Sequence, residues 1–206
     1  MVRKTLISAT AFAAVLVLSS CSETPATTES KVAEVKKDLP PEPVAGQSAF
    51  YQMYKPAREW ATDLMPLSLA GNDIEGIKSE NGKYPMWTAV FVSPSKREAR
   101  TFFYSVVDHG SDVHKGVTIG GPESWSGPTA KSRPFQNSQF NTNSDAAYKA
   151  AAEKAAAWLQ KNPDKKLSMV LTSTSHFPGP VWYVLWGDHK SGYDIFIDAT
   201  TGLPSK

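Results

Sequence analysis

The chain has 206 residues, with 22 Lys and Arg against 20 Asp and Glu, and a single cysteine. Two of the basic residues lie in the first 20 positions, which contain no acidic residue, so the rest of the chain is electrically balanced. A balanced chain without a basic block argues against nucleic acid as a partner, and one cysteine excludes an internal disulfide framework.

Residues 1–20 have the layout of an export signal. A short basic start precedes an apolar run over residues 6–18, which is shorter than the about 20 apolar residues of a membrane-spanning helix. The run ends in Leu18-Ser19-Ser20-Cys21, which resembles the lipobox of bacterial lipoproteins. The resemblance implies cleavage before Cys21, acylation of Cys21 and anchoring to a lipid bilayer; an ordinary secretory signal with an incidental cysteine is the alternative. In well-studied Gram-negative bacteria, an Asp directly after the lipidated cysteine favours retention in the inner membrane. This chain has Ser22 at that position, which favours the periplasmic or outer face of the outer membrane.

Residues 21–47 are predicted to be the lipidated cysteine and a disordered tether. The segment is rich in Pro, Thr, Ser, Glu and Lys and has no aromatic residue, so it cannot bury enough apolar area to offset the entropy of ordering. The remaining roughly 160 residues are enough for one sizeable core or two small ones.

Two helices are predicted in this folded part. In residues 56–64 the apolar positions have helical spacing, Pro56 suits a first turn, and Pro66 closes the segment. A stronger helix begins at the Ser144-Asp145 cap, runs through an alanine-rich stripe and ends before Asn162-Pro163.

Each predicted helix is followed by three runs typical of strands, over residues 71–78, 85–93 and 99–108 in the first half, and 167–174, 180–187 and 193–198 in the second. Pro85-Met86-Trp87 corresponds to Pro180-Val181-Trp182. We therefore predict an α+β fold of two αβββ repeats, over residues 48–117 and 144–206. Each repeat would be an antiparallel three-stranded sheet with one helix packed on one face. Residues 181–186 are apolar on both alternating faces, so the face away from the helix must meet the other sheet, the segment between the repeats, or a ligand.

The end of the second half, Tyr193-Asp194-Ile195-Phe196-Ile197-Asp198-Ala199-Thr200-Thr201-Gly202, resembles the PepSY family, and residues 180–184 look like the middle strand of that family. The match covers residues 146–204 and is weaker over 47–117. The resemblance implies a non-enzymatic module, without catalytic residues or cofactor, of a kind proposed to restrain peptidases. We therefore expect a membrane-anchored lipoprotein that binds or restrains an envelope protein or peptide, such as a peptidase. A structural or assembly factor of the envelope is the alternative, followed by a metal-dependent hydrolase.

Two motifs contain residue types associated with chemistry. His109, Asp112 and His114 are metal-ligating residue types close together, but their spacing matches no metal signature, so we interpret them as a polar loop and predict no metal site. Ser93 and Lys96 fit the S-x-x-K pattern of acyl-transfer enzymes, but they fall in a predicted hairpin turn.

Residues 118–143 are predicted to be an ordered segment between the repeats. A connection this long is often functional or disordered, and its aromatic residues argue against disorder. The candidate binding residues Trp125, Arg133 and Phe135 lie in it. Its aromatic side chains either plug an open sheet face or present Trp125 with Arg133 as a recognition surface. Plugging is favoured, because buried aromatic side chains dominate core energetics.

Overall fold

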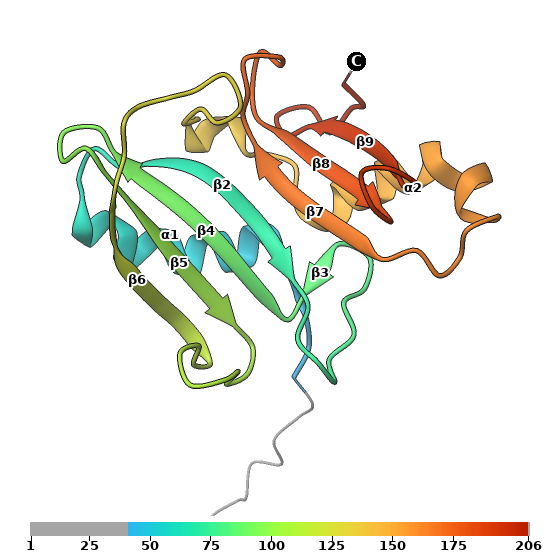
Figure 1. The fold of residues 1–206 in the computed structure, drawn as a ribbon, viewed down its shortest axis with the longest axis horizontal. Coiled ribbons are helices and arrows are strands. Elements are labelled where there is room, and N and C mark those ends of the chain that lie inside the picture. The colour runs from blue at the N-terminus through green and yellow to red at the C-terminus, as the bar shows by residue number, and fades with distance from the viewer. Residues whose placement is uncertain (1–40, 206) are drawn as a thin grey trace, which may run out of the picture. The chain divides into compact units, whose positions relative to one another are not determined.

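The computed structural model describes residues 41–205 (Figure 1). Cys21 and the signal segment therefore lie outside the described residues, as does most of the predicted tether. The elements, in chain order, are β1 (Val44–Ala45), α1 (Gly46–Trp60), β2 (Met65–Asn72), β3 (Lys83–Tyr84), β4 (Met86–Ser93), β5 (Glu98–Ser105), β6 (Gly116–Ser124), the 3₁₀ turn η1 (Asn137–Gln139), α2 (Ser144–Leu159), β7 (Leu167–Thr172), β8 (Val181–Trp186) and β9 (Tyr193–Asp198). Neither α-helix of this part of the chain is long and apolar enough to cross a membrane.

One antiparallel sheet of seven strands forms the body of the fold, in the order β6-β5-β4-β2-β7-β8-β9, and β1 pairs with β3 in a small second sheet. The predicted fold of two αβββ repeats with separate three-stranded sheets is therefore wrong. β2 pairs directly with β7, with Leu69 opposite Leu171, and β6 extends the sheet from residues predicted to begin the inter-repeat segment. Separate sheets would leave the edges of β2 and β7 unpaired, and their pairing satisfies those backbone groups.

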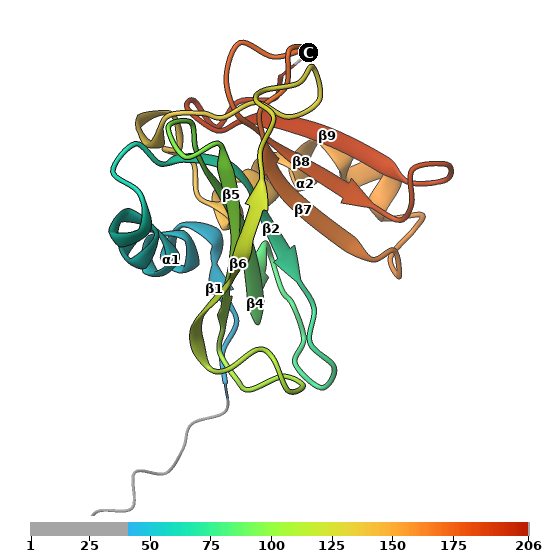
Figure 2. The same cartoon turned by 60° about the vertical axis from the view of Figure 1, so that its left-hand side comes forward.

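Both helices cover the same face of this sheet. In Figure 1 they lie behind the strands, and in the turned view α1 stands to one side of β4, β5 and β6 (Figure 2). Successive residues of a strand alternate between the two faces, and directly paired residues share a face. Trp87, Leu69, Leu171 and Trp182 therefore all lie on one face, the one that the helices cover. We call the opposite face, which neither helix covers, the open face.

α1 begins ten residues earlier than predicted. It starts at Gly46 and carries Pro56 inside it, and its buried stripe is Gly46, Ala49, Phe50, Met53 and Ala57. The predicted tether therefore ends too late at residue 47, since β1 and the first turn of α1 occupy residues 44–47. Pro56 removes one helical hydrogen bond without ending a helix whose apolar stripe continues beyond it.

The core centres on two tryptophans. The rings of Trp87 and Trp182 lie 6.1 Å apart at 68°, and both side chains are fully buried. A Cβ on Gly46 would lie 3.0 Å from the ring of Trp182 and 3.1 Å from the ring of Trp87. Glycine therefore allows α1 to begin directly against both tryptophans.

The start of α1 is capped by residues that lie about a hundred positions later. Ser144 Oγ accepts the N–H of Gly46 at 2.7 Å and donates to the carbonyl of Gly82 at 2.6 Å. Asn143 Oδ1 accepts the N–H of Gln47 at 2.9 Å. Since the first N–H groups of a helix have no partner within it, this cluster satisfies α1 and fixes it to the start of α2.

Candidate functional site

The three predicted binding residues do not form one surface. The N–H of Trp125 donates to the carbonyl of Arg97 at 2.9 Å, which places this half-buried residue beside the β4–β5 hairpin. Phe135 is only 3 % exposed, and it belongs to the core. Arg133 is exposed, and its N–H donates to the carbonyl of Ser173 at 2.9 Å.

A second aromatic residue of this segment, Phe140, is 2 % exposed. It packs edge-on against Phe50 at 5.2 Å and against Trp182 at 5.8 Å. These contacts are on the helix side of the sheet, so Phe140 fills the space between the helices and the strands. Phe140 therefore does not cover the open face of the sheet.

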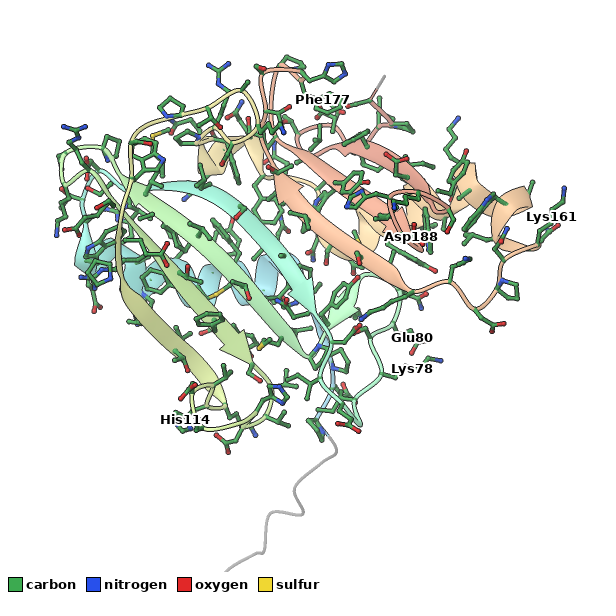
Figure 3. All side chains as sticks on the ribbon, viewed as in Figure 1. Lys78, Glu80, His114, Lys161, Phe177 and Asp188 are labelled. Carbon is green, nitrogen blue, oxygen red and sulfur yellow. The ribbon has the colours of Figure 1, made fainter. Side chains whose placement is uncertain are left out.

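The histidine loop between β5 and β6 makes local contacts. His114 Nδ1 lies 3.4 Å from Asp108 Oδ1, Asp112 accepts a hydrogen bond from Ser111, and His114 is at the exposed tip in Figure 3. The N–H of Lys115 and the nearby His114 lower the pKa of Asp108. Among residues 41–205, no group of three or more His, Cys, Asp or Glu is placed to hold a metal ion.

Ser93 and Lys96 serve the β4–β5 turn. Ser93 Oγ donates to Asp63 at 2.6 Å, and Lys96 Nζ donates to the carbonyl of Trp60 at 2.6 Å. The Ser93 hydroxyl and the N–H of Ser95 lower the pKa of Asp63. These contacts fasten the end of α1 to the hairpin, which is a structural role for the S-x-x-K residues.

The most distinctive feature of the open face is a row of five neighbouring rings, which we call the aromatic strip: His176, Phe177, Phe196, Tyr183 and His189. Successive ring centroids lie 4.7, 4.8, 5.0 and 6.0 Å apart. The two histidines are exposed, and the three central rings are partly exposed.

The register of the strands explains this row. Tyr183 of β8 is the direct partner of Phe196 of β9, and both side chains point away from α2. The β7–β8 loop adds Phe177 and the β8–β9 loop adds His189, whose ring is parallel to that of Tyr183 within 6°. In Figure 3 the labels Phe177 and Asp188 mark the opposite ends of β8. The strip therefore runs along this strand, on the side that no helix covers.

The hydroxyl of Tyr183 fixes one end of the strip. It lies 3.1 Å from His189 Nδ1, within hydrogen-bonding distance. Partial burial, with the nearby carboxylate of Asp194, raises the pKa of Tyr183. The phenol therefore keeps its proton at neutral pH and remains available as a donor.

A pocket of about 410 Å³ adjoins the other end of the strip. His176 and Phe177 belong to both the strip and the pocket, and Arg133 and Phe135 line its other side. The remaining lining residues are Pro134, Gln139, Ser173, Thr174, Ser175, Pro178 and Gly179. The lining is thus rich in hydrogen-bond donors and contains a guanidinium group but no carboxylate.

A larger and shallower hollow of about 700 Å³ lies along α2, beside Tyr148 and the Asn81 turn. Its charged lining residues are two lysines and two carboxylates, Lys83, Lys149, Asp145 and Glu153. Because these charges balance, the hollow favours no ligand charge, and the smaller pocket is the better candidate site.

Comparisons with known proteins concern the fold. No family model matches the chain, and no curated protein matches it in sequence. Among solved structures, the chain is similar to a candidate lipoprotein from Clostridium difficile 630, with a TM-score of 0.50 and 11 % sequence identity over 82 % of this chain and 94 % of that protein. At this identity the likeness extends to the fold alone.

Proposed function

We propose that this protein is a lipid-anchored, non-enzymatic binding protein of the bacterial envelope, which holds an envelope peptide or protein on its aromatic strip. The single observation that carries the proposal is the strip itself. Five rings lie in a row on a sheet face that neither helix covers. Aromatic side chains are enriched at the centres of binding surfaces, and a one-sided antiparallel sheet can leave its other face free for a partner.

The anchor is supported by two independent observations. Leu18-Ser19-Ser20-Cys21 resembles a lipobox, and the similar solved structure is that of a candidate lipoprotein. Ser22 favours the outer membrane as the final location. The resemblance of residues 146–204 to PepSY modules makes an envelope peptidase a partner to test.

Metabolic labelling with a palmitate analogue tests the anchor. The wild-type protein should carry the label and sediment with membranes, whereas Cys21→Ala should lose the label. Ser22→Ala, which changes the next residue, should keep it. Labelled Cys21→Ala would contradict acylation at this cysteine.

Affinity capture from envelope extract of the source organism, followed by rebinding of the purified partner, tests the strip. The double variant Tyr183→Ala/Phe196→Ala should lose a partner that the wild type retains. Tyr51→Ala is the matched control, because Tyr51 is an exposed aromatic residue (54 %) on α1. A partner retained by the strip variant, or lost equally from the control, would contradict a binding role for the strip.

A further inference from the structure

The pocket beside the aromatic strip has a definite charge preference. Arg133 is exposed at its rim, and a guanidinium group is always charged in a protein. None of the eleven residues that line the pocket is acidic, and Arg133 forms no ion pair within residues 41–205. The pocket is therefore complementary to an anion, and the planar fork of a guanidinium matches a carboxylate best.

The donors around Arg133 strengthen this complementarity. The hydroxyl groups of Ser173 and Thr174 and the amide of Gln139 also line the pocket, whereas the Ser175 hydroxyl already donates to the carbonyl of Ala130 at 3.2 Å. The amide oxygen of Gln139 is already occupied, since it accepts the N–H of Gln136 at 3.0 Å, which leaves its NH₂ group as a donor. Hydrogen bonds to an ionised group are stronger than those to a neutral one.

The walls of the pocket come from two chain segments, residues 133–139 and 173–179. The two segments that form them are hydrogen-bonded to each other: the N–H of Arg133 donates to Ser173, and the N–H of Ser175 donates to Ala130 at 2.8 Å. These backbone bonds fix the two segments to each other. Because the pocket adjoins one end of the strip and has a guanidinium group at its rim, a chain that lies along the strip can place a terminal carboxylate there.

We infer that the pocket binds the C-terminal carboxylate of an extended peptide, whose apolar side chains lie on the aromatic strip. Arg133 holds the carboxylate, and Phe177, Phe196 and Tyr183 stack against aromatic or proline side chains just before it. Aromatic-lined surfaces bind extended proline-containing segments, and backbone and side-chain donors capture peptide termini. The inference rests on the proposed function, and it adds the ligand class and the direction of the bound chain.

Isothermal titration calorimetry on the lipidated full chain in detergent tests this, with acetyl-Phe-Pro-Phe as the free acid and as the C-terminal amide. The acid should bind about tenfold more tightly than the amide, because charged hydrogen bonds contribute more than neutral ones. Arg133→Gln should reduce acid binding to the level of the amide. Arg58→Gln, which removes an exposed arginine from α1, should leave both affinities unchanged.

Tyr183→Ala should weaken the acid and the amide together, since it removes stacking and leaves the pocket intact. Equal affinity of the two peptides for the wild type would overturn the carboxylate assignment. Binding of neither peptide would overturn the peptide ligand. If Arg58→Gln lowered the affinity for the acid as much as Arg133→Gln does, the overall charge of the protein, and not the pocket, would explain the preference for the acid, and the carboxylate assignment would be overturned. None of these outcomes decides the proposed function, which the capture experiment tests separately. Melting temperatures equal to that of the wild type would establish that the variants are folded.

Discussion

Trp87 and Trp182 lie against each other under the seven-stranded sheet, and each donates its indole N–H to the chain just before a helix. Trp87 Nε1 donates to the carbonyl of Val44, two residues before α1, and Trp182 Nε1 donates to the carbonyl of Thr142, two residues before α2, both at 2.9 Å. The two rings therefore set where both helices begin relative to the sheet.

Replacing these tryptophans should reveal their coupling. Trp87→Phe and Trp182→Phe each remove a buried donor and part of a core ring, and each should lower the free energy of unfolding by about 1–3 kcal/mol. Because the rings touch, a double-mutant cycle should give a coupling of about 0.5–1.5 kcal/mol. Urea denaturation measures both quantities. Strictly additive effects would contradict a shared role of the two rings. As a control, Trp125→Phe, at the half-buried site beside the β4–β5 hairpin, should lower the free energy of unfolding less than either core substitution.

Ser144→Ala should be costly for a small change. It leaves the N–H of Gly46 and the carbonyl of Gly82 without their shared partner in a fully buried site. An unsatisfied buried polar group costs about 1–3 kcal/mol, so we expect a loss near the upper end of that range in chemical denaturation. Ser126→Ala, at an exposed position, should change stability by less than about 0.5 kcal/mol. Similar values for the two variants would mean that Ser144 does not link the helices.

Substitutions at two glycines with similar backbone angles should distinguish the cost of backbone strain from the cost of steric crowding. Gly76 and Gly82 have φ values of 83° and 78°, but an added Cβ meets nothing at Gly76 and lies 2.5 Å from the carbonyl oxygen of Ser144 at Gly82. Gly76→Ala should cost about 1–2 kcal/mol from the left-handed backbone alone. Gly82→Ala should cost about 3 kcal/mol or more, since overpacking is added. Equal losses in a thermal melt would exclude tight packing of this turn on α2.

Asp63→Asn should destabilise the protein in a pH-dependent way. Hydrogen bonds from Ser93 and Ser95 lower the pKa of Asp63 in the folded state, so its stabilisation is present above the unfolded pKa of about 4 and is lost as the pH falls through the folded pKa. The melting temperature of the variant should therefore be lower than that of the wild type at pH 7, and the difference should shrink below pH about 4. Asp164→Asn, at an exposed loop position, is the control. A difference that stays constant with pH would contradict this role for the carboxylate.

Local patterns in the sequence predicted several elements well. β9 spans the predicted residues 193–198, and α2 begins within two residues of the prediction, at Ser144, with Asn143 as its N-cap in place of the predicted Ser144-Asp145 cap. The turn after β9 also behaves as an Asp-Gly turn should, with Asp198 accepting the N–H groups of Thr200 and Thr201. These features depend on residues that are neighbours in the chain.

The errors arose where distant residues decide the structure. The start of α1 has no side-chain cap of its own, because Asn143 and Ser144 supply it. The pairing of β2 with β7 joins residues about a hundred positions apart, and no local pattern encodes it. β6 contains Gly120, Gly121 and Pro122, which indicate a loop, but an edge strand tolerates them.

The candidate site was predicted only in part. Arg133 is a candidate by its residue type alone, and it does line the pocket beside the strip. Sequence reasoning missed Tyr183 and Phe196, although the apolar character of both faces of residues 181–186 indicates that the face away from the helix meets something. Their proximity follows from the β8–β9 register, together with the loop positions of Phe177 and His189.

The way the chain enters the domain has a mechanical consequence. β1 is joined to β3 by only two residue pairs, Val44 with Tyr84 and Ala45 with Lys83, and the bond from Gly46 to Ser144 comes immediately after it. Tension applied from the N-terminal side therefore loads this short ribbon first and the Ser144 link next, before any strand of the large sheet. A molecule pulled by its anchor would give way in steps, lengthening at β1 and α1 while the sheet that presents the strip stays intact.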